Sequence, residues 1–131
     1  MGRKVETSTP QNTMAPVGPY SHIARVGDWI TISGTAGVNP ATGKLVGPDA
    51  ASQTTQILNA FEVMLASVDS DLDHIVHINV FLKNIDDFDA MNAAYAAYMD
   101  PRRPTRTTIA VADLPKPGAL LTMNLTAVRA A

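Results

Sequence analysis

The feature that most constrains the fold is a run of apolar residues with helical spacing after Asp49. Counted from Ile57, its members recur at steps of three, four, seven, eight and eleven residues, at Ala60, Phe61, Met64, Leu65 and Val68. This period lines the apolar side chains along one stripe of an α-helix, for which Asp49 is the expected N-cap. A helix with one apolar stripe needs another layer to cover it.

Runs rich in β-branched residues lie on both sides of this helix. Residues 23–26 and 29–34 precede it and are joined by a Gly-Asp pair, which is typical of a β-hairpin turn. Residues 74–82 follow it and predict a buried strand, because the run is shorter than an ordinary helix and rich in valine and isoleucine.

A second helical period and two more strands complete the chain. The helical period follows Asp86 and ends at Pro101, which cannot continue a helix. A strand is predicted over residues 106–111, and a last strand has apolar residues alternating at Leu121, Met123, Leu125 and Ala127. The order β-β-α-β-α-β-β contains two strand-helix-strand units, whose right-handed crossovers place both helices on one face of the sheet. We therefore expect an α/β (α+β) fold with a mixed sheet.

The division of the chain follows from the same patterns. Residues 1–14 are polar and aperiodic and are expected to form a flexible N-terminal arm. Residues 15–131 carry no linker or repeat and are expected to form a single domain. A sheet with helices on one face leaves its other face bare, and such a face is usually buried on a partner. We therefore expect an oligomer.

Composition excludes several classes of protein. The chain has no cysteine, which removes disulfides, thiolate zinc sites, iron-sulfur clusters and a cysteine nucleophile. A formal net charge of -2 gives no overall attraction to nucleic acid, so nucleic acid is not an expected partner. No apolar stretch is long enough to cross a membrane or to serve as a secretory signal, and the expected location is the cytoplasm.

Arg106 is the first candidate for a ligand contact, because it opens a predicted strand directly after a proline-containing turn. A guanidinium presents a planar fork that grips a carboxylate with two parallel hydrogen bonds, and it stays protonated at any working pH. The competing interpretation is a solvated basic cluster, since Arg102 and Arg103 stand close by in the sequence.

Three histidines and an aspartate-rich turn raise the question of a metal site. His74 and His77 are three residues apart in a predicted strand and would point to opposite faces, and His22 is remote in sequence. The aspartates at 69, 71 and 73 lack the glycine and the acidic twelfth position of a calcium-binding loop. They are expected to end a helix and solvate a turn, and neither a metal nor a cofactor is expected.

Other polar residues have both a chemical and a structural interpretation. Ser33 offers a hydroxyl, but it lacks a Gly-x-Ser-x-Gly turn and a histidine close in sequence, so it is either a nucleophile or a structural hydrogen-bonding group. Tyr20, in a Gly-Pro-Tyr segment, either closes a pocket or only packs. Asn92 is expected to point inward from the second helix and to brace that helix against a loop.

Short motifs occur in a fixed order along most of the chain. They cover residues 15–21, 32–34, 39–43, 91–95 and 104–108, followed by Leu114-Pro115. In this order they resemble the Rid/YjgF family. The resemblance implies a chorismate-mutase-like fold, a homotrimer whose sheets pack into a central barrel, and ligand sites in the clefts between subunits.

Members that resemble RidA hydrolyse reactive enamines and imines, such as 2-aminoacrylate and 2-iminopropionate, to the 2-keto acid and ammonia. The resemblance therefore implies a hydrolytic deaminase that acts on a small carboxylated substrate and protects pyridoxal-phosphate enzymes from their own leaked intermediates. Arg106 matches the arginine that holds the substrate carboxylate, and Tyr20 would cover the ligand from the adjacent subunit. Ser33, Gly34 and Asn92 match other positions of the family pocket or its supports.

Two positions depart from the RidA pattern. Thr108 stands where many members carry a cysteine, and Thr122 stands where the last strand carries a glutamate that orients the attacking water. A threonine cannot act as a general base at neutral pH, although its hydroxyl can position water. In the mechanism that the resemblance implies, Arg106 anchors the carboxylate, backbone carbonyls near Thr108 position the water, and Tyr20 limits solvent.

The same resemblance allows other activities. One is that of a pathway-specific relative, which acts on 2-aminomuconate or on aminoacrylate in pyrimidine breakdown. Another is that of a non-catalytic trimer that only binds a small ligand. A ribonuclease is disfavoured, because Arg102 and Arg103 are not accompanied by a histidine pair placed for acid-base catalysis.

Overall fold

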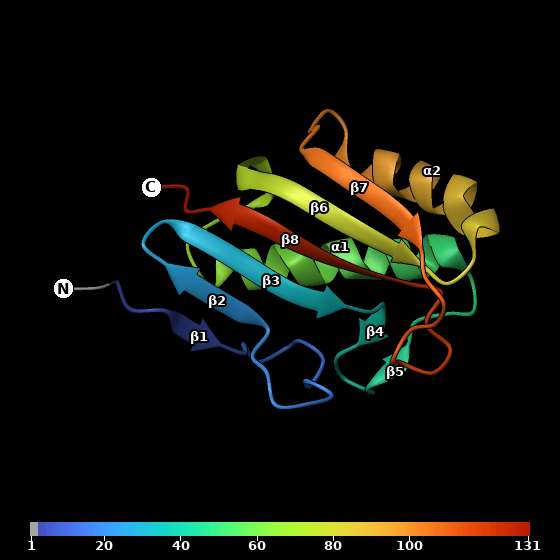
Figure 1. The fold of residues 1–131 in the computed structure, drawn as a ribbon, viewed down its shortest axis with the longest axis horizontal. Coiled ribbons are helices and arrows are strands. Elements are labelled where there is room, and N and C mark those ends of the chain that lie inside the picture. Colours follow the sequence, from blue (N-terminus) through green and yellow to red (C-terminus); the bar gives the residue numbers. More distant parts are fainter. Residues whose placement is uncertain (1–2) are drawn as a thin grey trace.

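The computed structural model describes residues 3–131, and Figure 1 shows their fold. The strands are β1 (Glu6–Ser8), β2 (Ile23–Val26), β3 (Trp29–Thr35), β4 (Val38–Asn39), β5 (Lys44–Leu45), β6 (Ile75–Leu82), β7 (Thr105–Ala110) and β8 (Leu121–Val128). The helices are α1 (Ala50–Ala66) and α2 (Phe88–Met99), with short 3-10 turns at Leu72–His74 and Ile85–Asp87.

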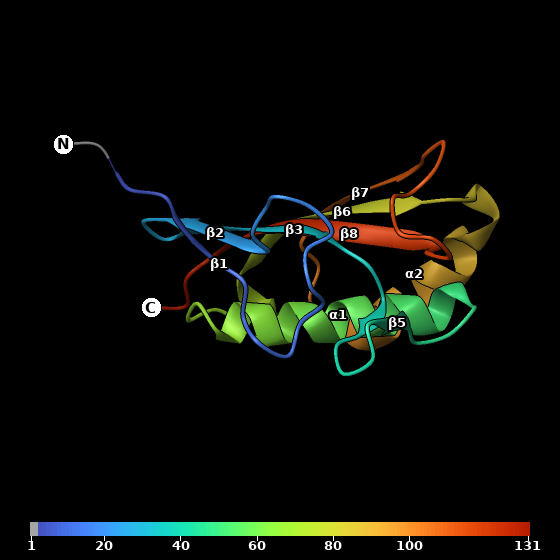
Figure 2. The same cartoon turned by 90° about the horizontal axis from the view of Figure 1, so that it is seen from below.

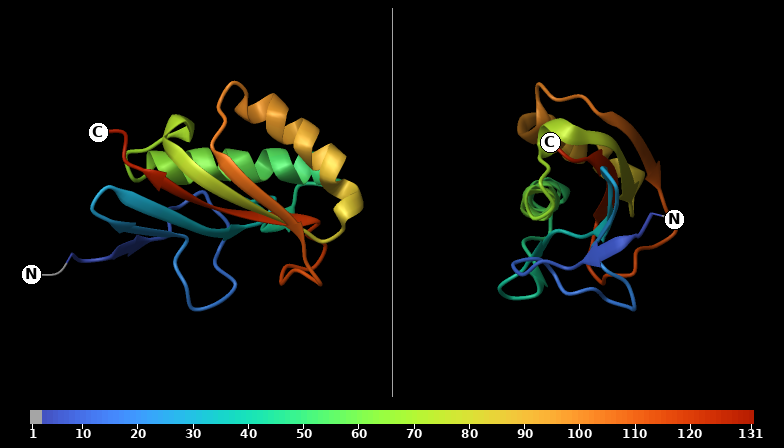
Figure 3. Two further views of the ribbon diagram at one scale, coloured as in Figure 1. Left: turned by 45° about the horizontal axis from the view of Figure 1, so that its top comes forward. Right: turned by 90° about the vertical axis from the view of Figure 1, so that its left-hand side faces the viewer.

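The main sheet is mixed and carries both α-helices on one face. Its strand order is β1-β2-β3-β8-β6-β7. Strands β6 and β7 run parallel and are connected through α2, whereas the other neighbouring strands are antiparallel. Figure 2 shows the sheet as one layer with α1 and α2 below it, and Figure 3 shows the two helices side by side. The predicted fold class and the predicted order of the main elements are confirmed.

Helix α1 is held by the apolar stripe that the sequence predicts. Ile57 and Phe61 are both 0% exposed and belong to the core between the helices and the sheet. Burying an apolar side chain of this size stabilises the fold by about 1.5–3 kcal/mol. Asp49 caps the helix, because its Oδ2 accepts a hydrogen bond from the backbone N–H of Ser52 at 2.8 Å. The same hydrogen bond lowers the pKa of the Asp49 carboxyl. No helix in residues 3–131 is both long and apolar enough to span a lipid bilayer.

The predicted hairpin of β2 and β3 turns at Gly27 and Asp28. Val26 pairs with Trp29 across the turn, and Gly27 has a φ of 58°, a left-handed conformation that glycine adopts without strain. The same register continues beyond β2, where the backbone N–H of Ser33 donates to the carbonyl of His22 at 2.9 Å. The hairpin therefore brings His22 and Ser33 opposite each other.

Two elements of the structure leave no clear pattern in the sequence. Strand β1 lies inside the segment expected to be a flexible arm, yet it pairs with β2 at the sheet edge, with Glu6 opposite Arg25. Its side chains are exposed, so its pairing rests on backbone hydrogen bonds and the ion pair of Glu6 with Arg25 and needs no apolar alternation. Strands β4 and β5 form a two-residue hairpin pair around the predicted turn at residues 39–44. Met1 and Gly2 of the predicted arm lie outside the described residues, and the flexibility of the arm stays a prediction.

Gly37 marks a close approach between the segment after β3 and helix α1. A Cβ built at this position would lie 2.7 Å from both the Cα and the carbonyl oxygen of Gln53. Backbone atoms of a packed helix cannot give way as a flexible side chain does. Gly37→Ala is therefore expected to lower the free energy of unfolding by about 1–3 kcal/mol, measured by urea denaturation. Gly34→Ala, whose Cβ would meet nothing within 4 Å, is the matched control, and an equal loss in both variants would contradict this reason.

The face of the sheet opposite the helices is polar at its centre and apolar toward its ends. Asn79 on β6 donates through Nδ2 to Oδ1 of Asn124 on β8 at 2.9 Å, and Thr107 of β7 pairs with Asn79 on its other side. Trp29 and Ile109 belong to the same face and are 50% and 46% exposed. Within residues 3–131 no helix covers this face (Figure 2).

Candidate functional site

Arg106 on β7 is held by two residues of helix α2. Its Nη2 donates a hydrogen bond to Oδ1 of Asn92 at 2.8 Å, and its guanidinium carbon lies 4.7 Å from the centre of the Tyr95 ring. The register of β7 against β6 places Arg106 and Thr108 on the face that carries the helices. A guanidinium has five N–H donors, so the contact with Asn92 leaves most of the fork available to a ligand.

Asn92 does not point into the core, and this corrects the sequence prediction. It is exposed on α2, where Met91 and Tyr95 are the buried neighbours. The predicted role as a brace holds in part, because Asn92 joins the helix to Arg106 of a strand rather than to a loop.

Arg106 lines a cavity of about 270 Å³ between α2 and the start of β7. Two other arginines on its wall are paired within the chain. Arg102 contacts Asp73 at 2.6 Å, and Arg103 contacts Asp100 at 3.3 Å. Within residues 3–131 Arg106 is the cavity arginine without an ion pair, which favours a ligand contact over a solvated basic cluster. The full lining is Asn92, Tyr95, Ala96, Asp100, Arg102, Arg103, Pro104 and Arg106.

The ring under the guanidinium is neutral. Burial raises the pKa of Tyr95, and the positive charge of Arg106 opposes this rise with a smaller effect. The Tyr95 hydroxyl and the Thr108 Oγ1 are buried and have no hydrogen-bond partner in the described part of the chain. The cation of Arg106 therefore lies on the side of the sheet that also holds two buried hydroxyls without a partner in the described residues, Tyr95 of α2 and Thr108 of β7.

A second group of candidate residues lies on the uncovered face of the sheet. Tyr20, Gly34 and Thr122 line one cavity of about 270 Å³, whose wall is completed by Met14, Val17, Ala36, Pro115 and Lys116. Tyr20 is 40% exposed. Thr122 pairs with Phe81 across β8 and β6, which puts it on the face opposite to Arg106.

Ser33 lines a neighbouring cavity of about 310 Å³, together with His22 and Asn124. Its Oγ lies 3.3 Å from Nδ1 of His22, and His22 is 1% exposed. A histidine therefore stands beside Ser33 although it lies 11 positions away in sequence. The hairpin register would have revealed this contact, because Gly27 and Asp28 lie midway between the two residues.

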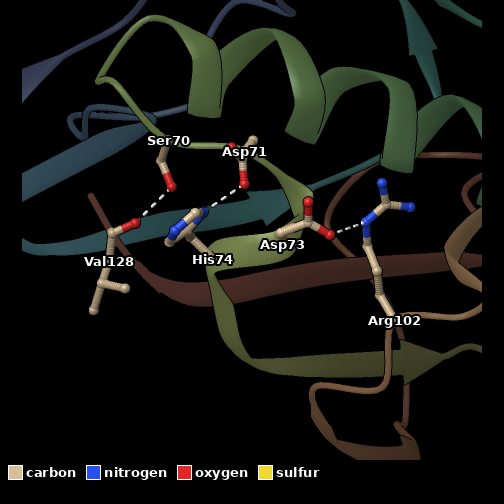
Figure 4. Close-up of polar contacts among 6 residues, drawn as sticks. All are labelled: Ser70, Asp71, Asp73, His74, Arg102 and Val128. Carbon is tan, nitrogen blue, oxygen red and sulfur yellow. Dashed lines mark hydrogen bonds and ion pairs between the residues drawn. The ribbon is translucent and has the colours of Figure 1, made fainter. Parts of the chain in front are cut away.

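The aspartate-rich turn after α1 is occupied by contacts within the chain. Asp71 lies 2.6 Å from Nδ1 of His74, and Asp73 pairs with Arg102, as the dashed lines in Figure 4 mark. Ser70 donates to the carbonyl of Val128 at 2.6 Å in the same turn. The hydrogen bond from His74 lowers the pKa of Asp71. His74 lies in the 3-10 turn and not in the predicted strand, because the strand begins at Ile75. These contacts explain the aspartates as parts of a turn.

Within one chain the candidate residues lie in separate groups. Arg106, Asn92 and Thr108 belong to the helix side of β7 at one edge of the sheet, and β3 lies three strands away in the order β3-β8-β6-β7. Tyr20, Gly34 and Thr122 form the group on the opposite face, with Ser33 in the adjoining cavity.

Comparisons with known proteins agree with this architecture. The family model described as Endoribonuclease L-PSP matches residues 10–129. A RutC family protein of Pyrococcus horikoshii is 34% identical over 106 residues, which cover 81% of this chain and 84% of the relative. A protein of Dermatophagoides farinae named 2-iminobutanoate/2-iminopropanoate deaminase is 30% identical, over 77% of this chain and 79% of its own. The crystal structure of the YjgF gene product of E. coli superposes with a TM-score of 0.87 at 32% identity and covers 95% of this chain and 98% of its own.

The mixed sheet with both helices on one face defines the class, an α+β protein of chorismate-mutase-like fold. Within this class the chain belongs to the Rid/YjgF family, as its motifs predicted. The family includes deaminases that act on reactive imines.

Proposed function

We propose that this protein is a hydrolytic deaminase that converts reactive enamines and imines of the 2-aminoacrylate and 2-iminopropionate type to the 2-keto acid and ammonia. The observation that carries the proposal is the environment of Arg106. Asn92 and the Tyr95 ring hold the guanidinium in place. No carboxylate of residues 3–131 forms an ion pair with it. A fixed and unpaired guanidinium at a cavity wall is suited to the carboxylate that these substrates share.

Hydrolysis of a protonated imine requires few catalytic groups from the protein. A protonated imine is electrophilic at the carbon beside the carboxylate, so water adds there and gives a carbinolamine. Its C–N bond then breaks with the electron pair on nitrogen, which leaves as ammonia, and the carbon keeps the oxygen of the water. In this mechanism Arg106 orients the substrate, backbone carbonyls near Thr108 position the water, and Tyr20 limits solvent. Ser33, Gly34 and Thr122 line the rest of the pocket.

We infer that the complete site forms between subunits of a homotrimer. Arg106 and Thr122 lie on opposite faces of the sheet, so a second chain must supply one of the two groups to a common site. The uncovered face supports the same inference, because contact with another subunit would bury the exposed apolar side chains of Trp29 and Ile109. Each site would then combine Arg106 of one subunit with Tyr20 of its neighbour.

The contacts of the basic and histidine residues argue against a nuclease. Arg102 and Arg103 are ion-paired within the chain, so they offer little net charge to a phosphate backbone. His77 uses both ring nitrogens on Thr105 and Asn79.

Turnover of 2-iminopropionate tests the proposal. An amino-acid oxidase generates the imine from alanine and is supplied in excess, so that hydrolysis of the imine limits the release of pyruvate. The protein is expected to accelerate that release. Unchanged release together with calorimetric binding of pyruvate would instead select the ligand-binding trimer. Faster turnover of 2-aminomuconate in parallel assays would select the pathway-specific relative.

Asn92→Ala is expected to raise KM for the imine by about 5- to 20-fold and to change kcat less. The variant keeps the charge of Arg106 but removes the hydrogen bond that orients its fork. A bond to a charged group contributes about 1.5–3 kcal/mol, and substrate binding loses only the part of it that orients the guanidinium. Steady-state kinetics of pyruvate release measure the effect. Asn59→Ala on α1 is the control, because its amide bonds Tyr98 instead. Equal KM values in the two variants would contradict the role of Asn92.

A further inference from the structure

His22 and Ser33 form a hydrogen-bonded pair at the end of the β2–β3 hairpin. Nδ1 of His22 lies 3.3 Å from Oγ of Ser33. Both residues line the cavity of about 310 Å³, but His22 is 1% exposed and Ser33 is half-buried. A ligand in the cavity would therefore meet the hydroxyl first, with the imidazole behind it.

The surroundings of the imidazole determine which nitrogen carries the proton. Nε2 contacts the backbone carbonyl of Met14, which only accepts hydrogen bonds, so Nε2 carries a hydrogen. In the neutral ring Nδ1 is then the acceptor and receives the hydrogen of the Ser33 hydroxyl. The Thr9 hydroxyl also accepts a bond from the backbone N–H of His22 at 3.2 Å. The N-terminal segment thus holds the imidazole with its lone pair aimed at Ser33.

We propose that His22 is the general base of the deaminase site and acts through the hydroxyl of Ser33. This inference rests on the proposed function, because it assigns the group that takes the proton of the attacking water. Thr122 cannot take it at neutral pH. The cavity of Tyr20 and Thr122 has no carboxylate or imidazole in its wall as far as residues 3–131 form it. Ser33 lines the adjoining cavity with His22 and is followed in sequence by Gly34 of that wall, and the relay assigns its hydroxyl the place between the two.

The relay balances over one turnover. As the water oxygen bonds to the carbon of the protonated imine, the π electrons of C=N move to nitrogen. One proton of the water passes to Ser33 Oγ while Ser33 passes its own proton to Nδ1 of His22. The imidazolium then returns a proton through the same hydroxyl to the carbinolamine nitrogen. The C–N bond breaks, the remaining O–H proton leaves with the departing ammonia as ammonium, and neutral His22 is restored.

The groups that face His22 offer no other base at neutral pH. The side chains and carbonyl that face it are uncharged at that pH, and they are Tyr20, with ring centres 6.0 Å apart, the Met14 carbonyl, and the hydroxyls of Thr9 and Ser33. The part of the cavity wall that β8 supplies, residues 124–126, is also uncharged. The ion pair of Arg25 with Glu6 lies further along β2 and β1.

The test compares kcat/KM of the wild type and of His22→Gln for 2-iminopropionate between pH 5.5 and 8.5. Glutamine can still donate to the Met14 carbonyl but has no basic nitrogen. The ratio of wild type to variant is expected to be roughly 10²-fold above pH 7, a usual size for a positioned base. The ratio is expected to narrow toward the acid end of this range, because a protonated imidazole cannot act as a base. Ionisation of the substrate is common to both proteins and cancels in this ratio.

Ser33→Ala and the double variant separate a relay from a structural contact. Because the two residues act as one unit, the double variant is expected to lose no more activity than either single variant. Pyruvate is expected to bind His22→Gln with its wild-type affinity, since Arg106 is intact. His74→Gln, which changes a histidine that pairs with Asp71 in a surface turn, is expected to keep the wild-type pH profile.

Two results would overturn the relay while leaving the deaminase intact. One is a His22→Gln variant with the wild-type rate and pH profile, and the other is a double variant whose losses multiply. If His22→Gln does not fold, Ser33→Ala decides alone, because it must show the same rate loss with His22 still present. A wild-type protein that does not accelerate the reaction at all would overturn the proposed function and the relay together.

Discussion

Replacing Arg106 by alanine is expected to lower kcat/KM for 2-iminopropionate by about 10²-fold or more. A carboxylate gripped by the guanidinium receives two hydrogen bonds, and a bond of this kind to a charged partner contributes about 1.5–3 kcal/mol. The loss of both therefore removes at least about 3 kcal/mol, which corresponds to about 10²-fold in rate. Pyruvate release in the oxidase-coupled assay measures kcat/KM, and calorimetry with pyruvate measures the loss of binding separately.

Two substitutions distinguish an anchor for the carboxylate from a general effect of positive charge. Arg106→Lys keeps the charge but loses the planar fork, and an intermediate activity is expected. Arg103→Ala removes a neighbouring cation whose side chain is 81% exposed, and less than about a twofold change is expected because charge at this exposure is screened by water. An Arg106→Ala variant with wild-type kinetics, or an equal loss in Arg103→Ala, would contradict the assignment. Thermal unfolding of each variant checks that the contact with Tyr95 is not the cause.

The fold follows from patterns that local residues create. The stripe that begins at Ile57, the breaker at Pro101 and the alternation that begins at Leu121 each place an element close to its observed bounds. They do so because burial of one face repeats every 3.6 residues in a helix and every two in a strand. Strand β1 cannot be predicted in this way. It is an exposed edge strand that is joined through its backbone, so its side chains show no periodic pattern of apolar residues.

The candidate site is predictable as a set of residues but not as an arrangement. The motifs select Arg106 and Asn92, yet their hydrogen bond joins residues 14 positions apart on a strand and a helix. The ring of Tyr95 under the guanidinium is likewise a product of packing, because its position on α2 is that of an ordinary core residue. The partner of Ser33 is different, since the hairpin register alone pairs it with His22.

Replacing Asn124 by aspartate is expected to dissociate the proposed trimer and to abolish activity with it. Oδ1 of Asn124 accepts a hydrogen bond from Asn79, and aspartate keeps this acceptor, so the contact within the subunit survives. The change adds a negative charge to the face that we propose to be buried between subunits. An unpaired charge removed from water costs several kcal/mol, and each copy in the assembly would bear this cost. Size exclusion with light scattering measures the mass against the 13.9 kDa of one chain.

The matched control is Asn59→Asp on the exposed side of α1. Asn59 also accepts a hydrogen bond through Oδ1, from the Tyr98 hydroxyl at 2.6 Å, so the same chemical change is made on the helix face and is expected to leave mass and activity unchanged. A trimeric and active Asn124→Asp variant would show that the uncovered face does not join subunits. A monomeric and fully active one would show that a single chain holds the whole site. Because Arg106 and Thr122 lie on opposite faces of one sheet, activity and assembly are expected to be lost over the same range of protein concentration.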